Sequence, residues 1–260
     1  MRTCSGIRRT ARAAGLGAIA LLASAPACSV KKTVPVVVPA AILNARSAGL
    51  DELVELLRRR DGRITSLSSN SLRVTFTSGR PESASLQEYR SAPGYLLVQR
   101  PASIRVNIQN PVTKTTIVDL LSVGDGFSIW YPRDNKFFTG LNSVREFELD
   151  GPNFTARPAH ILEAILPEGL DLSPPGSYIA MEEDQDAVAK YYVLTLYRQY
   201  AGPALYPVRK LWIERSSFTV SRQHTFRERG ELASVIHYSQ YTQLEDVQLP
   251  QAIRLERPAD

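Results

Sequence analysis

Alternation of apolar and polar residues recurs along most of this 260-residue chain. Leu72, Val74 and Phe76 alternate with polar neighbours, and residues 104–108 and 127–131 repeat the pattern. Such alternation is typical of strands that bury one face and expose the other. We therefore expect about ten strands. The later candidates cover residues 191–197, 208–214, 218–227, 231–241 and 252–255.

Two segments have helical spacing of their apolar residues instead. The first begins at Leu50, carries acidic residues in its first turn, and is followed by Gly62, a residue typical of helix C-caps. The second runs from about Pro158 to Leu166 and is ended by a proline. Few helices and many successive hairpins predict a mainly β (α+β) fold, built on one large, curved antiparallel sheet.

Two helices are too few to cover the concave apolar face of such a sheet completely. The uncovered part forms an open hydrophobic trough, which suits an acyl chain better than a polar ligand, or is filled by bulky side chains. Patterning leaves both alternatives open. Val106 and Ile129 occupy apolar positions of their strands, and we expect them to face this interior.

The start of the chain has the pattern of a secretory signal. Four arginines within residues 2–12 precede an apolar stretch, residues 13–23, that is too short to span a hydrocarbon core of about 30 Å as a stable anchor. Residues 22–28 resemble the bacterial lipobox, so we expect residues 1–27 to be a lipoprotein signal peptide and Cys28 to be lipidated. The alternative is an ordinary signal that is cut after Ala27.

Removal of the leader changes what the composition implies. The net charge of +5 falls to +1, with 27 basic and 26 acidic residues, which argues against a nucleic-acid partner. Cys4 leaves with the leader and Cys28 is acylated, so no thiol is left for a disulfide. Residues 28–48, which contain Pro35 and Pro39, are expected to form an acylated tether, and residues 49–260 the folded domain.

Few residues suggest catalysis or metal binding. His160, His224 and His237 are far apart and lie in no metal-binding or nucleophile motif. The acidic residues 182–186 lack the spacing of a calcium loop and are interpreted as a solvated loop. Residues 124–126 are interpreted as a hairpin turn. We therefore predict no enzymatic activity, cofactor or metal.

A set of short segments, taken in order, points to a known family. They are residues 95–101, 104–106, 117–118, 124–132, 210–215, 235–238 and 249–250. Together they resemble the core of the bacterial lipoprotein-sorting proteins LolA and LolB. The resemblance covers roughly residues 50–256 and implies an incomplete antiparallel β-barrel, covered by helices, around a cavity for lipoprotein acyl chains.

The resemblance also implies roles for two residues. Arg100 matches the arginine that holds the helical lid of LolA closed, and its five N–H donors suit that role. An edge arginine in water is the alternative. Val112 occupies the position of an exposed leucine in LolB that helps to insert cargo into the membrane, although a plain hairpin turn is also compatible with residues 110–115.

The lipobox favours the membrane-tethered member of the family. Because Ser29 follows the cysteine, and not the aspartate that retains enterobacterial lipoproteins in the inner membrane, we expect the periplasmic face of the outer membrane. The expected partners are acylated lipoproteins or lipids, the outer membrane through the anchor, and a soluble periplasmic carrier. The alternative function is a structural envelope lipoprotein that binds a protein partner without transferring cargo.

Overall fold

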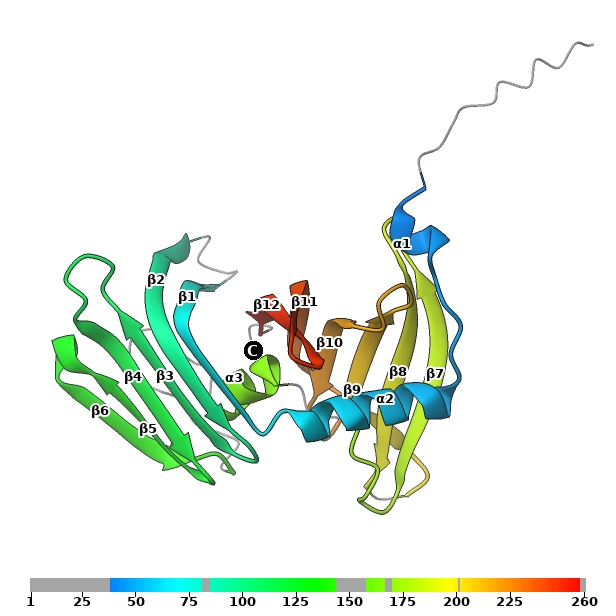
Figure 1. Ribbon diagram of the computed structural model, residues 1–260. Helices are drawn as coiled ribbons and strands as arrows, with labels where there is room; N and C mark the ends of the chain where they lie inside the picture. The colour runs from blue at the N-terminus through cyan, green and yellow to red at the C-terminus, as the bar shows by residue number, and fades with distance from the viewer. Residues whose placement is uncertain (1–37, 81–84, 144–157, 167–169, 201, 258–260) are drawn as a thin grey trace, which may run out of the picture. The chain divides into compact units, whose positions relative to one another are not determined.

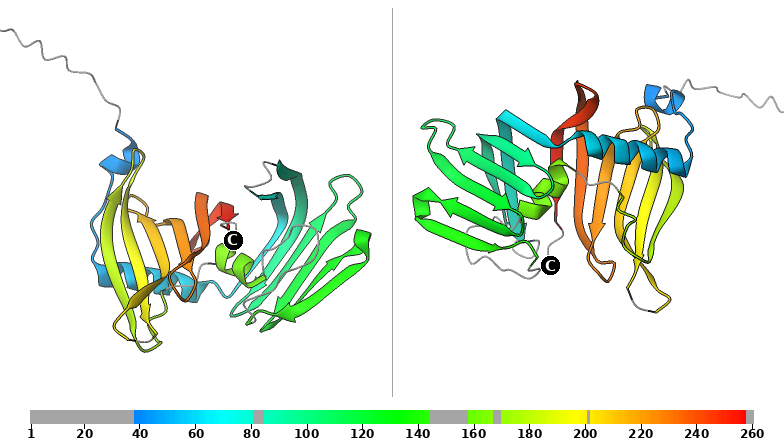
Figure 2. Two further views of the ribbon diagram at one scale, coloured as in Figure 1. Left: turned by 180° about the vertical axis from the view of Figure 1, so that it is seen from behind. Right: turned by 60° about the horizontal axis from the view of Figure 1, so that its bottom comes forward.

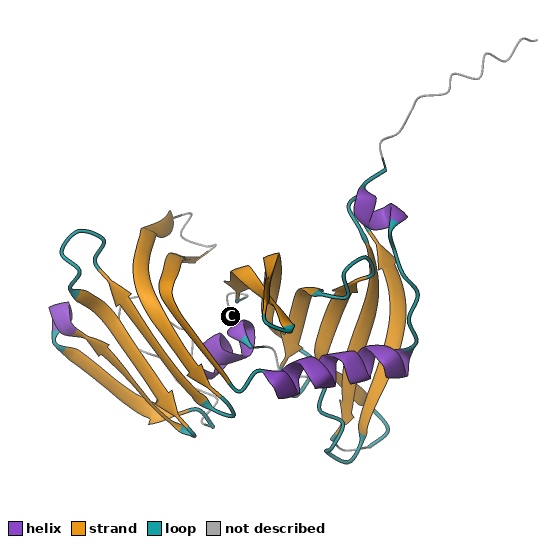
Figure 3. Cartoon of the chain, viewed as in Figure 1, coloured by secondary structure: helices purple, strands orange, loops and turns teal. Residues whose placement is uncertain are grey.

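Strands make up most of the computed structural model, which describes residues 38–80, 85–143, 158–166, 170–200 and 202–257 (Figures 1 and 3). The described residues form twelve strands and few helices, and every strand pairs antiparallel with its neighbours. Neither sheet closes into a barrel within these ranges. The predicted fold class, mainly antiparallel β with few helices and incomplete closure, is confirmed.

The first sheet consists of six strands in chain order, each joined to the next as a hairpin. Residues that pair across its strands share one face, so the register defines an inner apolar face and an outer face. The strands are β1 (Ser66–Arg80), β2 (Ser85–Gln99), β3 (Ser103–Gln109), β4 (Thr116–Val123), β5 (Gly126–Tyr131) and β6 (Lys136–Leu141).

The second sheet repeats this arrangement with the remaining six strands (Figure 1). Its central strands are buried on the side where apolar residues alternate, as the sequence predicts. The strands are β7 (Ser177–Gln185), β8 (Lys190–Gln199), β9 (Leu205–Glu214), β10 (Val220–Phe226), β11 (Leu232–Leu244) and β12 (Val247–Glu256).

The expectation of one large sheet is wrong, because the strands form two separate ladders. The break falls between β6 and β7, which end at Leu141 and begin at Ser177. Every other consecutive pair is joined by a short connection, whereas this one contains a helix. A hairpin extends a ladder by placing the next strand beside the last, and the long connection removes that constraint.

The two predicted helices are present. Helix α2 (Leu50–Arg63) crosses the strands of the second sheet (Figure 2), and α3 (Pro158–Ile165) matches its predicted range. The prediction that Gly62 caps α2 is wrong, because Gly62 lies inside the helix. The extended residue Ile64 ends it and leads directly into β1, so no left-handed cap is needed. The described ranges also contain the short helix α1 (Ala40–Leu43) and the 3-10 turn η2 (Pro132–Asp134).

The acidic residues 182–186 are not a solvated loop, since residues 182–185 belong to β7. Their carboxylates meet donors from β9 and the turn after it, on the far side of β8: Glu183 pairs with Arg215 at 3.0 Å, and Asp184 accepts a hydrogen bond from the indole N–H of Trp212 at 3.0 Å. These partners offset part of the negative charge of this edge strand.

The core is divided into two apolar clusters, which we call the first-sheet cluster and the second-sheet cluster. In the part of the chain that the structure describes, no helix is long and apolar enough to span a membrane. The buried members of the first-sheet cluster are Ile64, Ala92, Leu96, Val98, Ile104, Val106, Ile108, Val118, Leu120, Phe127, Ile129, Tyr131 and Leu166. Those of the second-sheet cluster are Leu53, Leu57, Ala164, Tyr192, Leu194, Leu211, Ile213, Val220, Ile236 and Tyr238.

Candidate functional site

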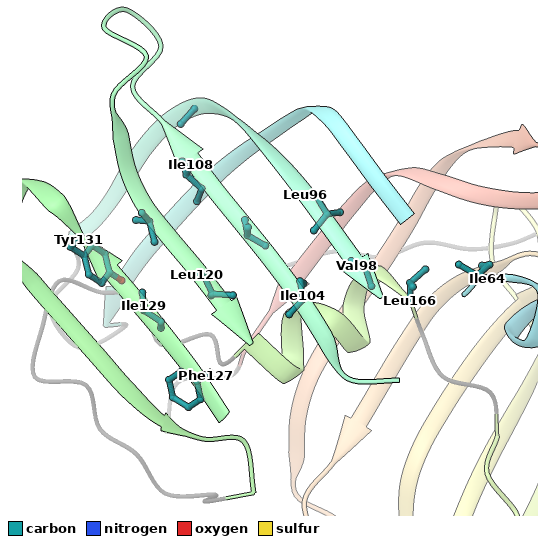
Figure 4. Close-up of a cluster of buried hydrophobic side chains, with 13 residues drawn as sticks. Ile64, Leu96, Val98, Ile104, Ile108, Leu120, Phe127, Ile129, Tyr131 and Leu166 are labelled. Atoms are coloured by element: carbon teal, nitrogen blue, oxygen red, sulfur yellow. The ribbon is translucent and has the colours of Figure 1, made fainter. Parts of the chain in front are cut away.

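The inner face of the first sheet is a continuous apolar surface (Figure 4). The register aligns Leu96, Val106, Leu120 and Ile129 across four neighbouring strands, and all four side chains are buried. Val106 and Ile129 therefore lie on the inward side, where the sequence places them. This surface offers contacts to aliphatic groups and no charge.

Helix α3 covers part of this apolar face. Ile161, Leu162 and Ile165 pack against the first-sheet cluster, whereas Ala164 belongs to the second-sheet cluster. One short helix therefore contributes to both apolar clusters, and two residues of β12, Val247 and Leu249, also pack against the first. Helix α3 and strand β12 therefore cover the inner face of the first sheet with apolar side chains.

A half-buried ion pair links α2 to the first sheet. The guanidinium of Arg100, which follows β2, lies 3.5 Å from the carboxylate of Asp61 on α2, and the two side chains are 24% and 19% exposed. The backbone N–H of Arg100 also donates to the carbonyl of Thr65 at 2.9 Å. Arg100 thus reaches a covering helix, although its partner there is a carboxylate. Its role as a lid residue stays a prediction.

A second ion pair, which sequence reasoning missed, holds α3. The guanidinium of Arg209 on β9 lies 2.6 Å from the carboxylate of Glu163, with side-chain exposures of 12% and 26%. The two residues are 46 positions apart. No local sequence pattern connects them. The sequence shows only a charged residue within an otherwise apolar helix and another charged residue within a strand.

The turn between β3 and β4 presents Val112 to solvent, with 85% of the side chain exposed. The side-chain oxygen of Asn110 accepts hydrogen bonds from the backbone N–H groups of Val112 (2.9 Å) and Thr113 (3.0 Å). Lys114 completes the turn in the left-handed region, with φ near 60°. The loop is ordered by the Asn110 side chain and by backbone hydrogen bonds within residues 110–115. Its exposed valine is compatible with both the insertion role and the plain turn.

The outer face of the first sheet contains a shallow pocket of about 450 Å³ that sequence reasoning also missed. Arg105 and Asp119 form an ion pair of 2.8 Å on its wall. Beside it, Trp130 and Phe137 leave 44% and 65% of their side chains exposed. The sequence signal that could have revealed this pocket is the presence of apolar residues at strand positions that should face water. The lining residues are Arg105, Asp119, Leu121, Ser128, Trp130 and Phe137.

The histidines add no metal site, since none of the described residues forms a group of three or more histidine, cysteine or acidic side chains able to hold an ion. His224 packs against Trp212 in a tilted arrangement, with ring centroids 4.5 Å apart. Burial, with Arg222, His237 and Lys210 nearby, lowers its pKa to about 4. His224 is therefore neutral at physiological pH. The predicted lipidation site, Cys28, lies outside the described residues.

No family model matches the chain, and no curated protein matches it. Solved structures do resemble it. A LolA superfamily protein from Nitrosomonas europaea is 14% identical, with 82% of this chain and 87% of that chain covered and a TM-score of 0.49. A DUF1329 family protein from Desulfovibrio piger is 12% identical, with 82% and 88% covered and a TM-score of 0.50.

A third structure, a domain named for outer membrane lipoprotein sorting from Vibrio parahaemolyticus, is 11% identical, with 79% and 84% covered and a TM-score of 0.49. The likeness with a TM-score of 0.50 supports a shared fold. At identities of 11–14% this likeness concerns the fold alone.

Proposed function

We propose that the chain, whose segments resemble LolA and LolB, binds the acyl chains of lipoproteins or other lipids in its apolar interior and takes part in lipoprotein sorting. The observation that carries this proposal is the uncharged inner face of the first sheet, which the short helix α3 partly covers. Its role is binding and transfer, without covalent chemistry. We place it at the periplasmic face of the outer membrane, anchored through Cys28.

The size of the α3 contact supports an acyl ligand. Ile161, Leu162, Ile165 and Leu166 together present about as many aliphatic carbons to the first-sheet cluster as one chain of about 16 carbons. Burial of each methylene contributes about 0.8 kcal/mol, so an acyl chain can replace these contacts without loss of buried apolar area. The ion pair between Arg209 and Glu163 is then a polar contact that must open.

The experiment compares acyl binding by variants of the two faces of one sheet. Val106→Trp and Ile129→Trp fill the inner face, and overpacking of this kind costs about 1 to 3 kcal/mol of folding free energy. Leu121→Trp adds the same group to the outer face and is the matched control. We expect weaker binding of a fluorescent fatty acid by folded inner-face variants and unchanged binding by the control.

Native mass spectrometry of the purified protein provides the second measurement, since bound lipid or acylated peptide appears as added mass. Unchanged fatty-acid binding by both inner-face variants, together with no added mass, would contradict the proposal. A soluble periplasmic carrier is the proposed source of the cargo.

One observation favours a second candidate function, a structural envelope lipoprotein that binds a protein partner. Exposed apolar residues gather on the outer face of the first sheet, beside the Arg105–Asp119 ion pair, and such clusters commonly mark interaction surfaces. If the protein has this second function, Phe137→Glu should abolish the effect of the protein in cells and Val106→Trp should not. Lipoprotein sorting predicts the reverse.

A further inference from the structure

Gln223 places an amide group in the middle of an apolar face. On β10 it pairs with Leu211 of β9 and Ile236 of β11, both members of the second-sheet cluster. Its side chain is fully buried, and neither its oxygen nor its nitrogen has a hydrogen-bond partner among the residues that the structure describes. An unpaired buried amide destabilises a fold, so a functional reason for it is expected.

Tyr238 presents a second polar group of this kind. It follows Ile236 by two positions on β11 and therefore lies on the same face, diagonal to Gln223. Diagonal residues on neighbouring strands are about 7–8 Å apart. Its buried hydroxyl has no partner within the described ranges, whereas the hydroxyl of Tyr241 donates to the carbonyl of Val220 at 2.6 Å. Burial raises the pKa of Tyr238, so this hydroxyl stays a donor.

The surroundings of these two groups favour a neutral ligand. Leu53 and Leu57 of α2 belong to the same apolar cluster. Two guanidinium groups lie nearby and both have partners: Arg209 pairs with Glu163 at 2.6 Å, and Arg60 hydrogen-bonds the hydroxyl of Tyr241. A carboxylate or phosphate would have to draw one of them from its partner, whereas a neutral group with one donor and one acceptor matches Gln223 and Tyr238 directly.

We propose that Gln223 and Tyr238 bind the secondary amide that joins an acyl chain to an amine. A trans amide directs its N–H and its C=O to opposite sides. The ligand N–H would donate to the side-chain oxygen of Gln223, and the ligand carbonyl would accept from the hydroxyl of Tyr238. An ester lacks the N–H and would leave the oxygen of Gln223 unpaired.

This inference rests on the proposed function, because the amide arrives only if an acyl chain enters the interior. Helix α3 links the two apolar clusters that the acyl chain would enter. Ala164 belongs to the second-sheet cluster, and Ile161 and Ile165 pack on the first-sheet cluster. Displacement of this one helix by an acyl chain therefore uncovers surface on both sheets.

The test is a competition experiment on the purified protein with two ligands of equal chain length. N-methyldodecanamide and methyl dodecanoate each displace a fluorescent fatty acid, and we expect the amide to bind about fivefold more tightly, as one additional hydrogen bond provides. Gln223→Leu, which keeps the shape and removes the acceptor for the ligand N–H, should bring the two ligands to equal affinity. Tyr238→Phe, which removes the donor to the carbonyl that both ligands carry, should weaken both of them and keep the amide preference. Thr195→Val is the matched control.

Thr195 suits this control because its hydroxyl is also buried and without a partner in the described part of the chain, but lies on the opposite face of the second sheet. Its variant should keep the amide preference. Melting temperature without ligand is a second readout: Gln223→Leu should leave it unchanged or raise it, because no protein partner is lost.

The possible failures are distinguishable. Equal binding of both ligands by the natural protein would overturn the inference and leave the proposed function intact, whereas binding of neither would overturn both. An amide preference that survives in Gln223→Leu, or unchanged affinity of both ligands for Tyr238→Phe, would overturn the inference. A melting temperature lowered by Gln223→Leu would also overturn it, since the amide would then have a structural partner.

Discussion

Trp212 lies among two cations and a histidine on the face of the second sheet opposite the second-sheet cluster. The guanidinium of Arg222 lies 3.9 Å from its ring centroid, and the ammonium of Lys210 lies at 5.2 Å. The ring of His224 packs beside the same indole. Cations stabilise an electron-rich ring, but they oppose a further positive charge on the neighbouring imidazole.

This arrangement predicts a pH dependence of stability. The pKa of His224 is about 4 in the folded protein and 6.5 as an unperturbed group, so the unfolded state binds more protons between these values. The free energy of unfolding should therefore be highest above pH 6.5 and decrease as the pH falls towards 4. After allowance for solvent screening, the loss is about 1 kcal/mol.

Chemical denaturation at pH 7 and at pH 4.5 measures this difference. His224→Gln serves as the control, because glutamine keeps a polar side chain that does not titrate. The variant should lose the part of the pH dependence that belongs to His224. An identical change in both proteins would contradict the prediction.

The covering helices are joined to the sheets by few polar contacts. Arg100 connects α2 to the end of β2 through Asp61, and Arg209 connects α3 to β9 through Glu163. At the other end of α2, the backbone N–H of Ala48 donates to the hydroxyl of Tyr192 at 3.0 Å. These contacts hold helices that must move if an acyl chain is to enter.

Arg100→Leu should therefore change binding and release in opposite ways. The substitution removes the donor that holds α2 and adds apolar surface beside the first-sheet cluster, so a fluorescent acyl peptide should bind more tightly and transfer more slowly. Arg105→Leu is the matched control, because Arg105 pairs with Asp119 on the outer face. Equal effects of the two substitutions would contradict a lid role for Arg100.

The turn between β3 and β4 permits a separate test of delivery. Val112→Glu should leave acyl binding unchanged and reduce transfer to liposomes, because a carboxylate resists the apolar boundary of a bilayer. Val188→Glu, at another exposed valine (63%) in the turn after β7, is the control. Unchanged transfer by Val112→Glu would favour the plain turn.

The folded unit, Val38–Asp260, begins after the proposed anchor. A single acyl chain gives marginal membrane binding, whereas the three chains of a bacterial lipoprotein anchor give stable binding, at about 0.8 kcal/mol for each buried methylene. Anchoring would keep the apolar interior close to the membrane that receives its cargo. This role of Cys28 is independent of every contact within the folded unit.

Cys28→Ala should release the protein from the membrane or leave an unprocessed precursor. Fractionation of cells, followed by detergent partitioning and mass measurement, distinguishes these forms from the anchored protein. Cys4→Ala is the control, because Cys4 lies within the expected leader. A Cys28→Ala protein that is processed and still fractionates with the outer membrane would contradict lipidation at this residue.

Local features of this protein follow from the sequence because they depend on neighbours along the chain. Alternation located the strands around Leu72, Ile104 and Phe127, and helical spacing located α2 and α3. Part of the site was predictable for the same reason, since the inward positions of Val106 and Ile129 follow from the two-residue period of a strand.

The tertiary structure alone decided how these elements meet. Two sheets form in place of one because the connection that contains α3 releases β7 from β6. The pairing of Arg209 with Glu163, and the placement of Gln223 beneath the helices, depend on the register of strands far apart in sequence. Side-chain period is a local property of the backbone, whereas such contacts arise only when the long-range packing of helices and sheets is complete.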